Sequence, residues 1–170
     1  MGNKFKNVLR KKFNIDFELF ASTINSYYDK YCSLFYDIEK YFGSYGSFYH
    51  IKLEKGFFIA NPPYDELLLE KMVDKFINSV KTSKHPLTIS YGLPNWGKYG
   101  VFNALEKTKN SEYLVYHRCM KYGEVFWYDK LNNNKILIPS HCRNIIQNEK
   151  GRVKHDVSNF DYLVNKYWVK

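Results

Sequence analysis

Four consecutive residues, Asn61-Pro62-Pro63-Tyr64, combine an amide, two prolines and an aromatic ring in an order that suits one reaction. The exocyclic amine of adenine is a poor nucleophile because its lone pair is delocalised into the ring. Two oxygen acceptors for its N–H hydrogens favour a pyramidal nitrogen, and the Asn61 side chain and the Pro62 main-chain carbonyl offer such oxygens. The tetrad therefore predicts methyl transfer to an adenine N6 amine, with S-adenosylmethionine as the methyl donor.

The prolines and the tyrosine make this arrangement rigid and give the base a surface. Each proline fixes its own φ and keeps the residue before it out of the α region, so Asn61 and Pro62 are held extended. Tyr64 offers a flat ring on which the target base stacks. A purely structural interpretation competes with this one: the same residues form a stiff strand-to-helix turn, in which Asn61 and Asp65 cap the following helix.

The segments around the tetrad place it at the end of a buried strand. Residues 56–60 form a continuous apolar run that the two prolines stop, and residues 65–80 carry an apolar stripe at helical spacing. Further strands are predicted at 13–20, 32–38, 86–91 and 113–117, further helices at 22–31 and 102–110, and a hairpin at 124–128 and 135–138. Residues 1–12 form a basic arm or short helix, and residues 151–170 form a tail of unassigned structure.

This alternation of strands and helices predicts an α/β fold in a single domain that spans residues 1–170. Its sheet is expected to be mostly parallel, with helices on both faces and the hairpin as an antiparallel edge. Ligands of such sheets bind beyond the carboxyl ends of the strands. Residues 20–25, Asp37 and the tetrad all follow predicted strands, so we expect them to share one ligand-binding edge.

The donor-binding residues are less marked, because no Gly-x-Gly-x-x-Gly loop follows the first strand. Phe20, Ala21, Ser22 and Asn25 stand in its place; the small Ala21 and Ser22 permit close approach to the backbone, and a helix starting there offers N–H groups to a carboxylate. Asp37, at the end of the second predicted strand, is placed to accept hydrogen bonds from ribose hydroxyls. Structural roles compete here too, with Ser22 as a plain helix cap and Asp37 as a turn residue.

The charge of the chain favours a polyanionic partner. A net charge of +9, from 26 Lys and Arg against 17 Asp and Glu, suits nucleic acid because each neutralised phosphate releases counterions. Lysine supplies most of this charge, and the codon bias of an A/T-rich genome explains the same excess. Among the few arginines, Arg118 and Arg143 are the candidates for a specific phosphate contact.

The cysteines and the apolar runs exclude several other classes of protein. Cys32, Cys119 and Cys142 are widely separated and show no metal-ligand spacing, so neither a metal site nor a disulfide is expected. No apolar run has the length of a membrane span. The basic N-terminus is not followed by the apolar stretch that a signal peptide requires. We therefore expect an intracellular protein with no membrane partner; a nuclear or a cytoplasmic location, and a viral origin, stay open.

Several motifs occur in one order along residues 17–96. They are Phe20-Ala21-Ser22-x-x-Asn25, Tyr31-Cys32-Ser33, Asp37, Tyr41-Phe42-Gly43-Ser44, Gly56-Phe57, Ala60-Asn61-Pro62-Pro63-Tyr64 and Pro94-Asn95-Trp96. The series resembles the methyltransferase domain of the phosphorylated CTD-interacting factor 1 family, the cap-specific adenosine N6-methyltransferases. This resemblance implies a Rossmann-like domain that uses S-adenosylmethionine and methylates N6 of the cap-adjacent 2′-O-methyladenosine of mRNA.

The resemblance also assigns roles to residues. It implies a catalytic shelf of Asn61, Pro62, Pro63 and Tyr64, and a donor site of Phe20, Ala21, Ser22, Asn25 and Asp37. Three positions depart from the family pattern: Tyr64 stands where Phe is usual, Thr23 replaces a Pro, and the amide Asn95 replaces an acidic residue.

The chain begins almost at the first strand, so the WW domain and the long helical region that precede the core in this family are expected to be absent. A protein partner is then expected to supply part of the surface that reads capped mRNA. Two other functions stay open: an adenine N6-methyltransferase for DNA or internal RNA, and a non-catalytic core that binds RNA or a partner.

Overall fold

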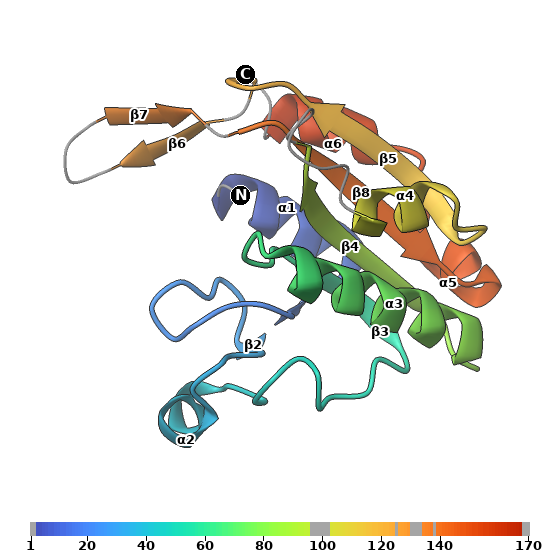
Figure 1. The fold of residues 1–170 in the computed structure, drawn as a ribbon, viewed down its shortest axis with the longest axis horizontal. Coiled ribbons are helices and arrows are strands. Elements are labelled where there is room, and N and C mark those ends of the chain that lie inside the picture. Colours follow the sequence, from blue (N-terminus) through green and yellow to red (C-terminus); the bar gives the residue numbers. More distant parts are fainter. Residues whose placement is uncertain (1–2, 96–102, 125, 130–133, 138, 168–170) are drawn as a thin grey trace.

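A six-stranded sheet in the strand order β2-β1-β3-β4-β8-β5 runs through the centre of the molecule (Figure 1). The computed structural model describes residues 3–95, 103–124, 126–129, 134–137 and 139–167. Along the chain the elements are α1 (Asn3–Phe13), β1 (Phe17–Glu18), β2 (Lys30–Tyr31), α2 (Tyr36–Glu39), the 3₁₀ helix η1 (Lys40–Phe42), β3 (Gly56–Ala60), α3 (Glu66–Thr82), β4 (Leu87–Pro94), α4 (Asn103–Lys109), β5 (Leu114–Met120), β6 (Phe126–Asp129), β7 (Asn134–Leu137), β8 (His141–Gln147), α5 (Glu149–Lys154) and α6 (Phe160–Tyr167).

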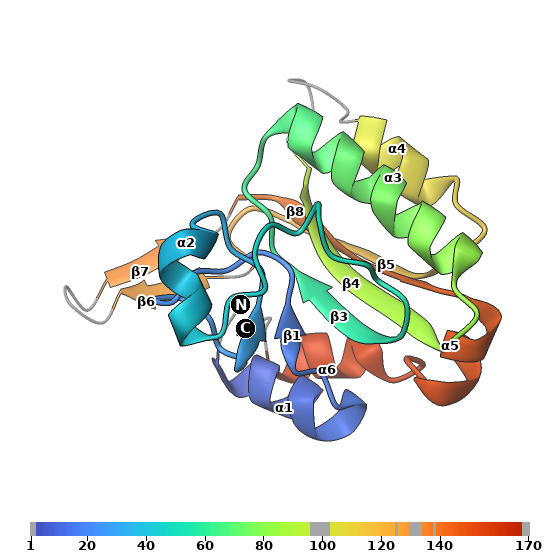
Figure 2. The ribbon, with the colours of Figure 1, turned by 90° about the horizontal axis from the view of Figure 1, so that it is seen from below.

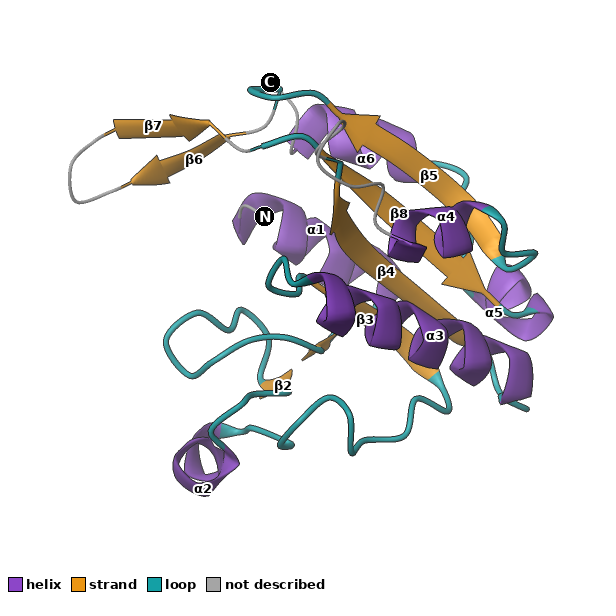
Figure 3. Ribbon diagram, viewed as in Figure 1, coloured by secondary structure: helices purple, strands orange, loops and turns teal. Residues whose placement is uncertain are grey.

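Strands β2, β1, β3 and β4 run parallel, and β8 is antiparallel to both of its neighbours, β4 and β5. Helices cover both faces of the sheet, with α3 and α4 on one face and α1 and α6 on the other (Figures 2 and 3). Successive residues of β3 alternate between the two cores, as a pleated strand requires: Phe58 and Ala60 face α3, whereas Phe57 and Ile59 face α1 and α6. The predicted α/β fold is confirmed in this form.

The helix predicted at residues 22–31 is wrong, because side chains take up the main-chain N–H groups that a helix would use. The Glu18 carboxylate accepts from the Tyr27 N–H (2.7 Å) and the Tyr28 N–H (3.4 Å), two donors that a helix over residues 22–31 would direct to its own carbonyls. The Ser22 N–H, which would have no partner within such a helix, donates to the Asn25 side chain (2.7 Å). A tight turn replaces the helix, with the Ser26 N–H bonded to the Ser22 carbonyl. Such local side-chain bonds compete directly with helix formation.

The first two predicted strands are shorter than expected and are displaced along the chain. Helix α1 continues through Phe13, so β1 keeps only Phe17 and Glu18, and β2 consists of Lys30 and Tyr31 rather than residues 32–38. Asp37 consequently lies on α2, beyond the end of β2, and is exposed. The premise that placed Asp37 at a strand end is therefore wrong.

Strand β8 was not predicted, yet it lies between β4 and β5 with all seven of its residues buried. Its sequence, His-Cys-Arg-Asn-Ile-Ile-Gln, has too few apolar residues to indicate a buried strand. The predicted hairpin exists as β6 and β7, but it forms a separate two-stranded sheet that projects from the body (Figure 1). The antiparallel edge of the main sheet is thus made by β8 and β5, and not by the hairpin.

The C-terminal segment that the sequence left unassigned, residues 151–170, contains the greater part of α5 and all of α6. Helix α6 packs Phe160 against Phe5 of α1, with ring centroids 6.0 Å apart. In the described part of the chain, none of the helices combines the length and the apolar composition that a membrane crossing requires.

Helix α5 approaches the start of β4 so closely that Gly151 is required there. A Cβ atom on Gly151 would lie 2.4 Å from the main-chain oxygen of Leu87. Gly151→Ala should therefore lower the free energy of unfolding by about 1–3 kcal/mol, the usual cost of overpacking, despite the better helix propensity of alanine. Urea unfolding followed by circular dichroism measures this change. Val153→Ala, at a side chain of the same helix that is 88% exposed, is the control and should change it little; equal losses in the two variants would contradict the close contact.

Candidate active site

The tetrad leaves the carboxyl end of β3 and leads into α3, as the sequence predicts. Asp65 caps α3, since its carboxylate accepts from the Leu68 N–H (2.8 Å), and its own N–H donates to the Pro63 carbonyl (3.1 Å). The capping interpretation is therefore correct for Asp65. Asn61 does something different, because its side chain turns toward β8.

The Asn61 side-chain oxygen is held by a buried arginine. Arg143 of β8 donates from Nη2 to Asn61 Oδ1 (2.6 Å) and from Nη1 to the main-chain oxygen of Ala60 (3.3 Å). Gly92 of β4 lies beside this bonded pair, and a Cβ atom there would be 3.9 Å from Asn61 Oδ1 and 4.0 Å from Arg143 Nη2. The guanidinium sets which end of the Asn61 amide is the oxygen, and a carbonyl oxygen with two lone pairs still has one for a substrate N–H.

Arg143 was predicted to contact phosphate, and that prediction is wrong because its side chain is only 1% exposed. Burial lowers the pKa of Arg143 to about 10, so the guanidinium still carries its charge at neutral pH. Nothing in the local sequence marks this role, because the partner of Arg143 lies 82 residues earlier in the chain. The other arginine proposed for phosphate, Arg118, donates to Asp161 (2.9 Å) and Asn165 (2.8 Å).

Tyr64 lies at the rim of this site, with 39% of its surface exposed. Partial burial raises the pKa of its hydroxyl, and the Arg143 charge acts in the opposite direction. The ring is thus close enough to Arg143 for an electrostatic effect, yet part of its surface can still meet a base. Pro62 is buried, whereas Pro63 is exposed.

The predicted donor-site residues Phe20, Ala21, Ser22 and Asn25 come together in the turn between β1 and β2. Phe20 packs on Phe48 with centroids 4.9 Å apart, and the Ala21 N–H donates to the Cys32 carbonyl. Phe20, Ala21 and Ser22 are half-buried. This turn adjoins the tetrad, because β1 lies beside β3 and the Leu19 N–H donates to the Ile59 carbonyl (2.8 Å).

A buried ion pair that the sequence did not reveal supports the β1–β2 turn. Lys6 Nζ lies 2.5 Å from Glu18 Oε1, and both side chains are almost fully buried. Because the other Glu18 oxygen accepts from Tyr27 and Tyr28, one carboxylate ties helix α1 to the end of the turn. The predicted basic arm is therefore a structural helix with one lysine inside the protein.

Gly43, in the motif Tyr41-Phe42-Gly43-Ser44, closes the loop that follows β2. It adopts a left-handed backbone with φ of 101°, and a Cβ atom there would lie 2.6 Å from the Asp29 carbonyl oxygen. A side chain is thus excluded by both conformation and space. Ser44 next to it shares a hydrogen bond of 2.5 Å with Ser33, which joins the two motifs on either side of α2.

A sequence profile described as "Phosphorylated CTD interacting factor 1 WW domain" matches residues 1–130 of the 170. The chain belongs to this family. The resemblance that the motifs indicated is thereby confirmed, and in this member of the phosphorylated CTD interacting factor 1 family the matched stretch runs from α1 to β6.

Two curated relatives are similar to this family member over part of its length. Both are named mRNA (2'-O-methyladenosine-N(6)-)-methyltransferase, from Homo sapiens and from Mus musculus, and both are 40% identical over 88 residues. The aligned residues make up 52% of this chain but only 12% of each relative. The chain therefore matches a small part of the relatives' length.

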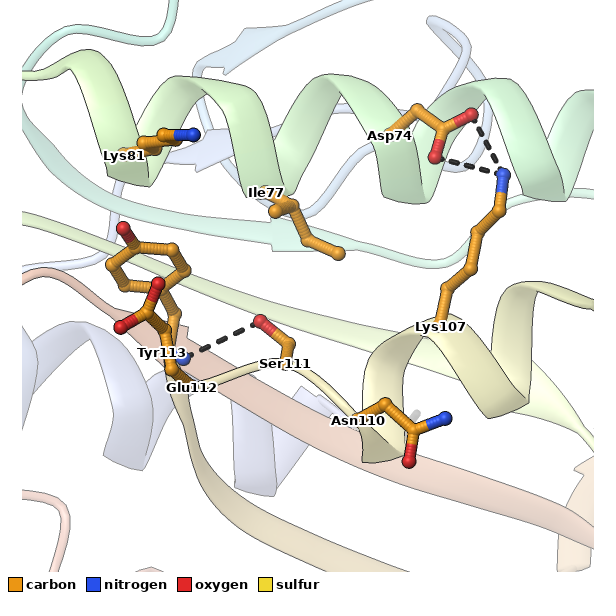
Figure 4. Close-up of a pocket in the computed structure, with 8 residues that line it drawn as sticks. All are labelled: Asp74, Ile77, Lys81, Lys107, Asn110, Ser111, Glu112 and Tyr113. Atoms are coloured by element: carbon orange, nitrogen blue, oxygen red, sulfur yellow. Dashed lines mark hydrogen bonds and ion pairs between the residues drawn. The ribbon is translucent and has the colours of Figure 1, made fainter.

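Two shallow pockets of the family member lie away from the tetrad. One, of about 400 Å³, lies between α3 and the connection from α4 to β5 and contains the Asp74–Lys107 ion pair (2.9 Å) (Figure 4). The other, of about 470 Å³, adjoins Gly56 and Phe57 at the amino end of β3. Neither is lined by a residue of the predicted catalytic or donor site, so neither supports that site. Trp96, the last residue of the Pro94-Asn95-Trp96 motif, lies outside the described residues.

The expectation of unpaired cysteines is wrong for two of the three. Cys119 of β5 and Cys142 of β8 lie opposite each other in the antiparallel pair and form a disulfide, whereas Cys32 is free and buried. Residues 23 positions apart have no recognisable spacing in the sequence. Only the pairing of the unpredicted strand β8 with β5 brings these cysteines together.

Proposed function

We propose that this chain carries an S-adenosylmethionine-dependent adenine N6-methyltransferase centre that acts on mRNA, at the cap-adjacent 2′-O-methyladenosine. The observation that carries this proposal is the position of Asn61: its amide oxygen lies at the carboxyl end of β3, oriented by Arg143 (2.6 Å) and next to the β1–β2 turn. The names of the two relatives, which describe this activity, support the same substrate class.

In the proposed reaction, Asn61 Oδ1 and the Pro62 carbonyl accept the two N6 hydrogens of the adenine. These bonds draw the nitrogen lone pair out of conjugation and direct it away from the protein oxygens. Arg143 keeps Asn61 Oδ1 in place, so little reordering is needed as charge develops on N6. Tyr64 stacks on the base. After the transfer, one N6 proton passes to the protein oxygen that accepts its hydrogen bond and from there to solvent.

The residues of the β1–β2 turn suit a methyl-donor site by their partial exposure, small size and apolar surface. Phe20, Ala21 and Ser22 are half-buried, so each presents surface to a ligand while its backbone is held in place. Ala21 adds little bulk, and Phe20 offers an apolar ring beside the turn. S-adenosylmethionine supplies an electrophilic methyl group on its sulfonium. Asp37 as a ribose contact stays a prediction without the strand-end geometry that first suggested it.

The partner in this proposal is capped mRNA, which the net charge of +9 favours. Because the chain matches only 12% of each relative, we further propose that surface beyond this chain, such as a protein partner, contributes to reading the cap.

The direct test is methyl transfer to three substrates in one assay: capped RNA that begins with 2′-O-methyladenosine, the same RNA without a cap, and single-stranded DNA. With labelled donor and nucleoside mass spectrometry, we expect N6-methylation of the capped RNA at a higher rate than of the other two. Higher rates on uncapped RNA or DNA would replace the cap-adjacent substrate with the internal-RNA or DNA alternative. Donor binding without transfer to any substrate would favour the non-catalytic alternative.

A further inference from the structure

A cluster of metal-ligating side chains lies on the β5–β8 pair, outside the methyltransferase site. The cluster consists of His117, Cys119 and Cys142, whose ligand atoms all lie within 4.8 Å of one another. We propose that in the reduced protein these three residues bind one Zn²⁺ ion, and that the Cys119–Cys142 disulfide is the alternative, metal-free state of the same site.

The strand register places the three ligands on one face of the sheet. His117 and Cys119 are two residues apart on β5 and so point the same way, and Cys142 lies directly opposite Cys119 on β8. Side chains on rigid, paired strands need no folding step to converge on a cation. The site is therefore preorganised by the sheet itself.

Hydrogen bonds orient the His117 ring as a metal ligand. Asn144, opposite His117, donates through Nδ2 to the Cys142 carbonyl (3.5 Å), which leaves its Oδ1 to face His117 Nδ1 (2.7 Å). Since Oδ1 can only accept, Nδ1 carries the hydrogen and the lone pair is on Nε2. Nε2 points to Cys119 Sγ at 3.4 Å. A second partner that fixes the tautomer in this way is typical of histidines that bind metal.

The ligand types and spacings fit zinc. Zn²⁺ prefers thiolate and imidazole in tetrahedral geometry, in which neighbouring ligand atoms lie roughly 3.5–3.8 Å apart. The Nε2–Sγ distance of 3.4 Å is already close to that value, and reduction lets the two sulfurs separate by side-chain rotation. His117 and Cys119 are exposed whereas Cys142 is buried, so the fourth position is open to solvent. Three protein ligands and an exogenous fourth complete the coordination.

The two states interconvert by a balanced reaction. Two molecules of a low-molecular-weight thiol reduce the disulfide, giving two cysteine thiols and one molecule of the oxidised thiol. Zinc then displaces one proton from each thiol as the two Zn–S bonds form. Because the metal joins β5 to β8, the zinc-bound protein is expected to unfold at a higher temperature than the reduced, metal-free protein.

The test uses the full chain, reduced with a phosphine and titrated with Zn²⁺ against a chromophoric chelator. We expect one zinc per chain, release of close to two protons at neutral pH, and a rise in Tm. Cobalt(II) in place of zinc should give the thiolate-to-metal absorption of a tetrahedral site. Protein oxidised to the disulfide should show none of these signals.

The variants separate the site from adventitious binding. Cys142→Ser and the exposed His117→Gln should each weaken zinc binding at least 100-fold, and Asn144→Ala about 10–100-fold as an orienting residue. Cys32→Ser is the matched control, since Cys32 is a free cysteine outside the cluster, and should bind as the parent does. Zinc affinity unchanged in His117→Gln and in a Cys119→Ser/Cys142→Ser double variant, or equal affinity of the oxidised and reduced parent, would overturn the proposal. Methyl transfer is not a readout in this test, so its result is independent of the proposed function.

Discussion

Asn61→Ala should reduce the rate of methyl transfer by on the order of 10²–10³-fold, the usual effect of removing one preorganised group that stabilises charge in the transition state. The substitution removes the side-chain acceptor for the N6 hydrogen and leaves the Pro62 carbonyl alone. Donor binding should stay within about twofold of the parent value, because the β1–β2 turn makes its own contacts to Cys32, Glu18 and Phe48.

Single-turnover kinetics with saturating donor measure this effect without contribution from product release. Asn78→Ala is the matched control, since Asn78 is an exposed asparagine on α3, and it should leave the rate unchanged. A rate in Asn61→Ala equal to that of the parent would remove Asn61 from the mechanism and with it the main support for the proposed function.

Arg143→Met should lower both the stability of the protein and the rate of methyl transfer. Methionine has a similar length, but it donates no hydrogen bond, so the buried Ala60 carbonyl loses a donor at a cost of about 1–3 kcal/mol. Asn61 loses the bond that orients its amide, and we expect kcat to fall about 10–100-fold with a smaller change in the KM of the donor. This split distinguishes a positioning residue from one that only stabilises the fold.

Two control variants test separately the charge of Arg143 and its position in the protein. Arg143→Lys keeps the charge but cannot make both bonds with a planar group, so its kcat should lie between those of the parent and the methionine variant. Arg152→Met removes an exposed arginine that donates to the Glu112 carbonyl (2.9 Å), and it should leave kcat unchanged. A loss of stability in Arg143→Met with kcat preserved would show that Asn61 is held by other contacts.

The tetrad and its flanking elements were predicted from the sequence because their signals are local. The apolar run of β3, the prolines that end it and the helical stripe of α3 follow one another within residues 56–82, and each depends on its own neighbours. The motif series was likewise sufficient to recognise the family, which the profile match over residues 1–130 confirms.

The errors occurred where a side chain from elsewhere in the chain satisfies the backbone or completes the site. Glu18 takes the N–H groups of Tyr27 and Tyr28, so no helix forms where a helix cap at Ser22 favoured one. The position of the predicted edge hairpin was wrong because β8 and β5 form the antiparallel edge of the sheet in its place. Strand β8 pairs with β4 and β5 through main-chain hydrogen bonds, which its side-chain sequence does not indicate.

By itself the sequence therefore determined the family, the α/β class, the strand and helix around the tetrad, and Asn61 as the proposed acceptor. Only the tertiary structure decided that Arg143 holds Asn61, that Lys6 and Glu18 support the β1–β2 turn, and that His117, Cys119 and Cys142 form one cluster. The physical reason is the separation along the chain over which each interaction acts. Periodicity and turn chemistry act between neighbours in the chain, whereas the insertion of β8 between two other strands is a property of the assembled sheet.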